Sequence, residues 1–282
     1  MKKIISLVLA LMLMFSIPAF ATWNKNKPAG SDLISDIDTL VISNNTAVES
    51  AIQNMHGLVN LKVVRTNVTT VTVTADSLWL QKSGDLAREF TSVSEAIAIT
   101  TSGASGLDTG AEGNVWYYIW IIAKDDNTIN GLLSASATAP TLPSGYTYKT
   151  LVSAAHNTSG DFVNFIQEGR VYTYVTDITI ASGTSSSWAS IDITAYVPSA
   201  ISSVAFGGLF TNQNNGLLSS DASLSGAVSW TTKYNNSINC LGSGGNQAYW
   251  KFQILTANTL MWAGSGVSVV VAVSGFEINL IS

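Results

Sequence analysis

The feature that most constrains the fold is a succession of β-branched and aromatic segments that begins at Asn60 and continues to the end of the chain. Valine and threonine dominate Val63–Thr74, which is typical of β-strands because branched side chains fit a pleated surface. Val115–Ala123, a run of tryptophan, tyrosine and isoleucine, predicts a buried strand, and the alternation in Gly266–Leu280 predicts a strand buried on one face. Glycine and proline punctuate these runs as expected of a sandwich or barrel.

The other predicted strands divide near Gly169–Arg170 into a central β module, residues 60–170, and a C-terminal β-sandwich, residues 171–282. Loops are expected at Ser182–Ser187, Asn212–Asp221 and Asn235–Gln247, which are rich in serine, amides or glycine. The remaining predicted strands are Ser77–Lys82, which continues the valine–threonine run, Ser92–Thr101, Tyr146–Ala155, Phe162–Tyr174, Val175–Ala181, Ser203–Leu209, Ala227–Tyr234, Tyr249–Leu255 and Thr259–Trp262.

Residues 1–21 have the three parts of an export signal. Lys2 and Lys3 form a basic start, Ile4–Ile17 is an almost wholly apolar core, and Ala19–Ala21 places small residues where signal peptidase needs them. The core is about 14 residues, shorter than the roughly 20 that a membrane-spanning helix requires. We therefore expect export with cleavage after Ala21 and a location on a virion, on a cell surface or outside the cell. An uncleaved membrane tether is the alternative.

Residues 22–59 are predicted to form an extended lead and one amphipathic helix. Pro28 and Gly30 exclude a helix from the lead, and an apolar stripe at helical spacing then continues to Gly57. Asn44 and Asn45 interrupt this stripe, either as a polar layer that sets the register of a coiled coil or as solvent-exposed amides of a helix packed on a sheet. The apolar residues that form a candidate seam between subunits are Leu33, Ile37, Leu40, Val48, Ile52 and Met55.

The charges and reactive side chains exclude several classes of protein. Only 11% of the residues are charged and the net charge is −5. Beyond the Lys2–Lys3 pair of the export signal there is no run of lysine or arginine, so we expect no nucleic-acid partner. Because Cys240 is the only cysteine, an intrachain disulfide is excluded. His56 and His156 stand far apart and have no nucleophile motif beside them. The sequence therefore predicts a protein that is not an enzyme and has no cofactor and no metal site.

Aromatic rings and amides are the candidate ligand-binding groups, because rings stack on sugar faces and amide-rich loops adapt to different ligands. Trp188 follows the serine loop and is expected to be exposed, whereas Trp116 and Trp120 in the apolar strand are expected to pack in a core or a subunit interface. The candidate ligand-binding residues are Trp188, Asn212, Asn214, Asn215, Asn235, Asn236 and Trp250.

Three parts of the chain carry a resemblance to a known family. They are Trp23, Lys25, Pro28, Gly30 and the Asn44–Asn45 pair; Gly106–Gly110, Trp116–Trp120 and Thr138–Tyr146; and Trp188–Pro198. These parts resemble phage tail-fibre and other virion surface proteins. The resemblance implies a structural or receptor-binding protein, usually a homotrimer, that contacts a cell-surface glycan or other virion proteins. A secreted carbohydrate-binding module without catalysis is the alternative.

Overall fold

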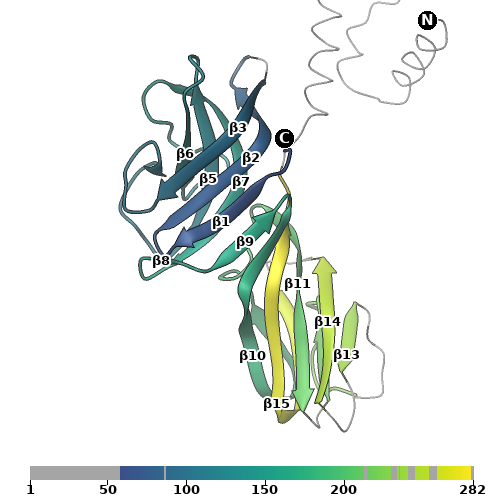
Figure 1. The fold of residues 1–282 in the computed structure, drawn as a ribbon. Helices are drawn as coiled ribbons and strands as arrows, with labels where there is room; N and C mark the ends of the chain where they lie inside the picture. The colour runs from purple at the N-terminus through teal and green to yellow at the C-terminus, as the bar shows by residue number, and fades with distance from the viewer. Residues whose placement is uncertain are drawn as a thin grey trace, which may run out of the picture. The chain divides into compact units, whose positions relative to one another are not determined.

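The computed structural model describes residues 58–280, apart from residue 86 and the segments 213–214, 230–233, 235, 241–244 and 254–258. Every regular element in these residues is a β-strand (Figure 1), which confirms the mainly β class. Contacts divide the chain into two units, and all fifteen strands lie in the unit that comprises Leu58–Ser83 and Arg88–Ser282. The predicted helix, with the seam residues Leu33, Ile37, Leu40, Val48, Ile52 and Met55, lies outside the described residues.

The first three strands form an antiparallel meander. β1 (Lys62–Asn67) pairs with β2 (Thr70–Lys82), and β2 pairs with β3 (Arg88–Ala98). In the turn between β1 and β2, the side-chain oxygen of Asn67 accepts a hydrogen bond from the backbone N–H of Thr69 at 2.9 Å. The valine–threonine run that was expected as one strand is therefore a hairpin, because asparagine favours such local turns over continued pairing.

The next strands form a second layer. β5 (Trp116–Lys124) pairs with both β6 (Ile129–Ser134) and β7 (Tyr146–Thr158), and the short β4 (Gly106–Leu107) runs parallel to β6. A carboxylate oxygen of Asp126 accepts a hydrogen bond from the Thr128 N–H at 2.9 Å and shapes the β5–β6 turn. The predicted buried strand is therefore confirmed, and an acidic turn follows it.

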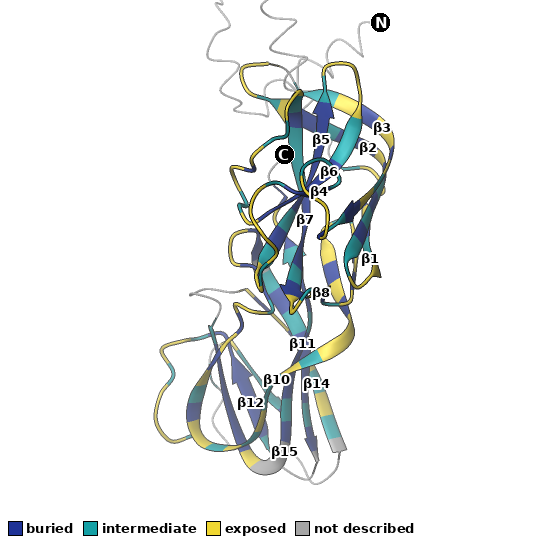
Figure 2. Cartoon of the chain, turned by 90° about the vertical axis from the view of Figure 1, so that its left-hand side faces the viewer, coloured by how far each residue is buried: buried dark blue, intermediate teal, exposed yellow. Residues whose placement is uncertain are grey.

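These two layers enclose the first part of the hydrophobic core. Leu78 and Ile97 of the meander and Ile119, Leu133 and Val152 of the second layer are all fully buried. Burial alternates with exposure along much of these strands (Figure 2), as it does when one face of a sheet packs on a core and the other faces water. The layers meet where the last two residues of β2 pair with β7.

Two short strands lead into two very long ones. β8 (Asp161–Phe162) pairs with β7, and β9 (Phe165–Glu168) lies between β1 and β10 (Val171–Asp192). β10 pairs along most of its length with β15 (Thr259–Ile278) through several register shifts. The segment Ser182–Ser187, which is expected to be a loop, is part of β10. Its residues have weak strand propensity, and pairing with β15 stabilises the strand instead.

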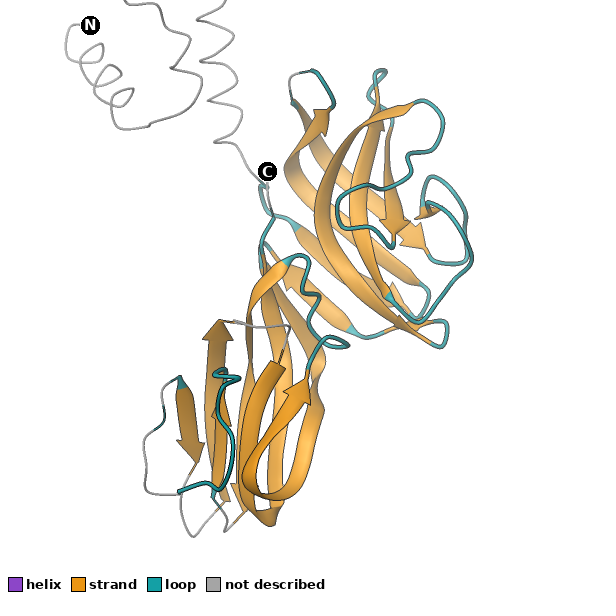
Figure 3. Cartoon of the chain, turned by 180° about the vertical axis from the view of Figure 1, so that it is seen from behind, coloured by secondary structure: helices purple, strands orange, loops and turns teal. Residues whose placement is uncertain are grey.

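The long strands β10 and β15 run side by side (Figure 3), and β15 pairs with further strands along different parts of its length. The second half of β15 pairs with β11 (Ser202–Asn212), which in turn pairs with β14 (Gly245–Gln253). The first half of β15 pairs with β12 (Gly216–Ser219), and β12 pairs with β13 (Ser237–Cys240). The Thr211 hydroxyl and the buried Cys240 thiol lie 3.6 Å apart and link β11 with β13. β15 therefore joins β11 and β12, since its second half pairs with β11 and its first half with β12.

Several other boundaries differ from the predictions. The expected loop Asn212–Asp221 contains β12, and the expected loop Asn235–Gln247 contains β13. The expected strands Thr259–Trp262 and Gly266–Leu280 form one strand, β15. Of the expected strand Ala227–Tyr234, residues 227–229 contain only an isolated bridge between Ala227 and Ser187. Short strands that depend on a tertiary partner carry too little local pattern to be recognised.

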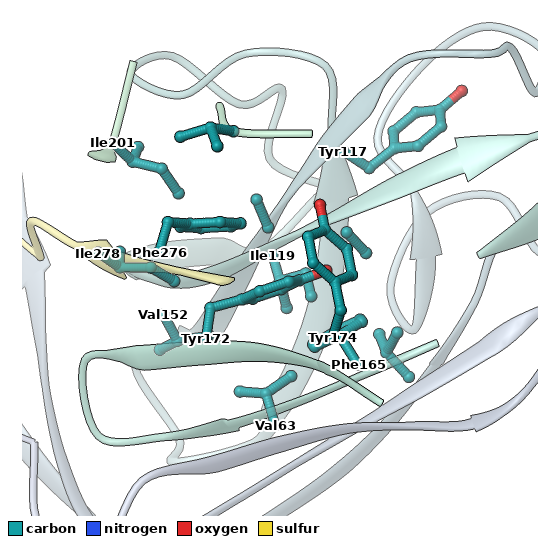
Figure 4. Packing of buried hydrophobic residues seen from close by; sticks show 14 of the residues in the cluster. Val63, Tyr117, Ile119, Val152, Phe165, Tyr172, Tyr174, Ile201, Phe276 and Ile278 are labelled. Atoms are coloured by element: carbon teal, nitrogen blue, oxygen red, sulfur yellow. The ribbon is translucent and has the colours of Figure 1, made fainter. Parts of the chain in front are cut away.

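A stack of aromatic rings lies in the core where β9, β10 and β15 run side by side. The Tyr172 ring lies between Phe165 and Phe276, with ring centroids 4.4 Å and 4.2 Å away, and Figure 4 shows Phe276 lying over Tyr172. Trp116 adds edge contacts to both Tyr172 and Phe276, and its indole N–H donates to the Thr194 carbonyl at 2.9 Å. Trp116 is therefore partly buried and packs against the core, in agreement with the expectation that it packs in a core or a subunit interface.

Candidate functional site

The two tryptophans among the candidate ligand-binding residues are buried. Trp188 is 8% exposed and packs edge-on against Tyr234, so the expectation that it is exposed is wrong. Trp250 is 3% exposed, and its indole N–H donates to the Ala272 carbonyl at 3.1 Å. Neither ring offers a face to a ligand. Trp188 packs with Leu217, Met261 and Ala263, and Trp250 stacks on Phe252, because a tryptophan ring has a large apolar surface to bury.

The candidate asparagines are spread over several structural positions. Asn212 is the last residue of β11, and Asn214 and Asn235 lie outside the described residues. The Asn215 N–H donates to the Ser265 hydroxyl at 2.7 Å. Asn236 is exposed, has a φ of 50°, and accepts a hydrogen bond from the Ser219 hydroxyl at its carbonyl. Asn215 and Asn236 therefore form hydrogen bonds through their backbone groups. The described candidate asparagines do not line one common pocket.

The most exposed large hydrophobic side chain of the described residues is Tyr249, which is 77% exposed at the centre of β14. It lies opposite Gly208 of β11, and Phe206 and Phe210 flank Gly208 on the same face of the sheet. Both phenylalanines are half-buried. Diagonal neighbours across an antiparallel pair are within reach of aromatic side chains. We call this surface, formed by Phe206, Gly208, Phe210, Gln247, Tyr249 and Lys251, the β11–β14 face.

Glycines allow the phenylalanine rings to lie flat on the sheet. A Cβ at Gly208 would lie 2.4 Å from the Phe210 ring, and a Cβ at Gly275 would lie 2.7 Å from the Phe206 ring. Because neither position has a side chain, the rings cover the backbone instead of projecting into solvent. The result is a flat aromatic surface from which Tyr249 projects.

Polar side chains surround the ring of Tyr249. Gln247 and Lys251 are exposed on the same face of β14, since residues two apart in a strand share a face. The Lys251 ammonium forms an ion pair with Glu277 of β15. This combination of one projecting ring with amide and ammonium donors suits a partner that has both apolar and hydrogen-bonding groups.

The titratable side chains of the described residues occupy scattered positions. The His156 ring packs on Trp116 with centroids 5.1 Å apart, and burial lowers the pKa of its imidazole. Burial raises the pKa of the Glu95 carboxyl. Within the described ranges no group of three or more histidine, cysteine, aspartate or glutamate residues lies together as metal ligands would. No helix in the same part of the chain is long and apolar enough to cross a membrane.

Sequence reasoning chose Trp250 and missed Tyr249. Adjacent residues of a strand point to opposite faces, so one of these two aromatics had to be outside, but the sequence alone does not say which. The signal lies in the partner strand, where Gly207 faces inward below Trp250: a Cβ there would lie 2.9 Å from the indole ring. The glycine leaves room for the larger side chain inside.

Comparisons with known proteins add no relative. No protein-family model matches the sequence, and a search of curated proteins finds no match.

Proposed function

We propose that this chain is a structural and adhesive surface protein of the phage tail-fibre type, which displays loops and a sheet face for recognition of a host or another surface. Export with cleavage after Ala21 and assembly as a homotrimer through the Leu33–Met55 segment and the aromatic central β module belong to the same proposal. The observation that carries it is the β11–β14 face, on which a largely exposed Tyr249 projects from a flat aromatic surface.

The physical argument concerns what an exposed tyrosine contributes to binding. A tyrosine ring loses only two side-chain torsions when it is fixed, and it offers apolar area together with a hydroxyl. Tyrosine is accordingly enriched among the residues that dominate binding energy. Leaving such a ring in water loses the roughly 1.5–3 kcal/mol that burial of a large apolar side chain yields. A partner surface that covers Tyr249 recovers this free energy.

A secreted carbohydrate-binding module without catalysis is the second candidate, and the same ring favours it. The apolar faces of sugars stack on aromatic rings, and Gln247 and Lys251 place donors beside Tyr249 for sugar hydroxyls. The two candidates differ in the partner. A glycan array detects free-sugar binding by the module, whereas a structural adhesin requires the intact partner surface.

The test compares two single substitutions of exposed residues. Tyr249→Ser removes the projecting ring, and Val175→Ser is the control because Val175 is 53% exposed on another strand, β10. Labelled full-length protein is incubated with a panel of bacterial cells and with purified envelope fragments. We expect wild type and Val175→Ser to bind one of them equally, and Tyr249→Ser to bind at least about tenfold more weakly. Equal binding by all three proteins, or binding of none to any surface, would contradict the proposal.

A further inference from the structure

Four of the eight lysine and arginine residues in the described ranges gather around one segment of β7. The Lys82 ammonium and the Arg88 guanidinium lie over the Tyr148 ring, 5.2 Å and 4.7 Å from its centroid. The other two, Lys124 and Lys149, lie over the rings of Tyr146 and Trp120, at 5.0 Å and 5.5 Å. We call Lys82, Arg88, Lys124 and Lys149 the basic cluster.

Strand pairing explains why these residues meet although they are far apart in the sequence. At the end of β2, Lys82 pairs with Tyr148 and the preceding Gln81 pairs with Lys149. On the other side of β7, Lys124 of β5 pairs with Tyr146. The short β2–β7 pairing therefore brings three strands with basic residues to one place.

Two of the four cations form hydrogen bonds with Asp125, and the other two do not. Lys82 donates to the Asp125 carboxylate at 2.9 Å, and Arg88 donates to the Asp125 backbone carbonyl at 3.0 and 3.1 Å. A hydrogen bond from Lys82 lowers the pKa of Asp125, and the charges of Lys82 and Arg88 lower it further. Among the described residues, Lys124 and Lys149 have no carboxylate within ion-pair distance. Hydrogen bonds from Thr128 lower the pKa of the Asp126 carboxyl, and the charge of Lys124 lowers it further without an ion pair. These two ammonium groups are the ones open to a ligand.

Lys124 and Lys149 lie on the same outer face of the second layer. Lys149 is opposite Ile122, and Ile122, Trp120 and Tyr146 belong to one apolar cluster that is separate from the main core. Lys124 follows Ile122 by two residues and packs on Tyr146, so it shares that face. Both stems cover aromatic rings while the ammonium groups remain near water. Two like charges on neighbouring strands repel each other, and a bound anion relieves that repulsion.

Hydrogen-bonding groups lie beside the two ammonium groups. The Asn130 amide donates to the Tyr146 hydroxyl at 2.5 Å, and Tyr146 and Thr147 are only partly buried. Charge complementarity determines the ligand class: the site attracts anions, but the chain as a whole carries a net charge of −5. A long nucleic acid needs many phosphate contacts, whereas an acidic saccharide needs one or two cations with hydroxyl and ring partners beside them.

We propose that the face formed by Lys124, Lys149 and Tyr146 binds an acidic saccharide, with its carboxylate or phosphate group between the two ammonium groups and a sugar oxygen accepting a hydrogen bond from the Tyr146 hydroxyl. The inference rests on the proposed adhesive function, because it names a class of ligand for an adhesive protein. The site is on a different surface from the β11–β14 face.

The test uses double variants with equal changes in charge. Lys124→Met with Lys149→Met keeps the apolar stems over the rings and removes two charges. Lys62→Met with Arg170→Met is the matched control, because Lys62 pairs with Glu168, Arg170 donates to the Leu280 carbonyl, and neither belongs to this face or to the β11–β14 face. Binding of full-length protein to an oligogalacturonate, a phosphorylated oligosaccharide and a neutral cello-oligosaccharide is measured by calorimetry at low and high salt. Thermal unfolding of each variant establishes that it is folded.

We expect wild type to bind one or both acidic oligosaccharides at low salt, more weakly at high salt, and not to bind the neutral one. The two acidic probes separate a carboxylate from a phosphate source. The Lys124/Lys149 variant should bind at least about tenfold more weakly, because it loses its charge-assisted hydrogen bonds to the anion. The control should match wild type. Failure of wild type to bind either acidic probe, or equal losses in both double variants, would overturn the inference. Loss of cell binding by Tyr249→Ser alongside that failure would leave the adhesive function standing.

Discussion

The hydroxyl of Tyr172 offers a sharp test of the core. Tyr172 is fully buried between Phe165 and Phe276, and its hydroxyl has no hydrogen-bond partner among the described residues. An unsatisfied buried polar group costs about 1–3 kcal/mol. Tyr172→Phe removes that cost and keeps the ring stack. We therefore expect the substitution to stabilise the protein by about 1 kcal/mol, which raises the Tm by about 2–4 °C in a chain of this size.

Tyr174 provides a matched control in the same strand. Its hydroxyl donates to the Tyr196 carbonyl at 2.6 Å, so Tyr174→Phe loses a hydrogen bond and leaves a carbonyl oxygen without that donor. We expect it to destabilise the protein by about 1 kcal/mol. Urea unfolding followed by tryptophan fluorescence measures both variants. The same chemical change in two neighbouring tyrosines is thus expected to have opposite signs.

The dependence of the free energy of unfolding on pH in the alkaline range gives a second measurement. Burial raises the pKa of the Tyr172 hydroxyl well above its ordinary value of 10.0, and the adjacent Tyr174 raises it further. A raised native pKa means that the folded state holds its proton more tightly, so stability is complete below about pH 10 and is lost as the pH rises from there toward the native pKa. Tyr172→Phe should therefore lose less stability than wild type above about pH 10. A destabilised Tyr172→Phe, or an unchanged pH dependence in the alkaline range, would show that the hydroxyl has a partner and would refute the argument.

Two further predictions concern packing and assembly. Gly207→Ala should destabilise the protein by about 3 kcal/mol or more, because its Cβ would lie 2.0 Å from the Ala272 carbonyl oxygen, whereas Gly113→Ala, with its nearest contact at 3.8 Å, should change the urea midpoint little. Ile37→Asp together with Ile52→Asp should dissociate the proposed homotrimer, because an unpaired buried charge is costly; light scattering coupled to size exclusion decides this, and a monomeric wild type would contradict it.

The β class and the positions of the main strands were readable from local pattern. Val115–Ala123 matches β5 (Trp116–Lys124) closely, because a long apolar run with a turn motif after it allows few alternatives. The start of β7 at Tyr146 also matches the start of the predicted strand Tyr146–Ala155. Period-two alternation also determines that adjacent aromatics such as Tyr249 and Trp250 face opposite sides of a strand.

The candidate sites depended on pairings that no local pattern encodes. Gly207 lies under Trp250 in the β11–β14 register, and this contact, made across strands, places Trp250 inside and Tyr249 outside. After its N-terminal lysine pair the sequence has no run of basic residues, yet two pairs between β2 and β7 and the β5–β7 ladder bring Lys82, Lys124 and Lys149 together. By itself the sequence determined the strand-forming character of the chain, since propensity and alternation are local. Only the tertiary structure decided which faces are covered and which charges meet, because those depend on contacts between residues distant in the chain.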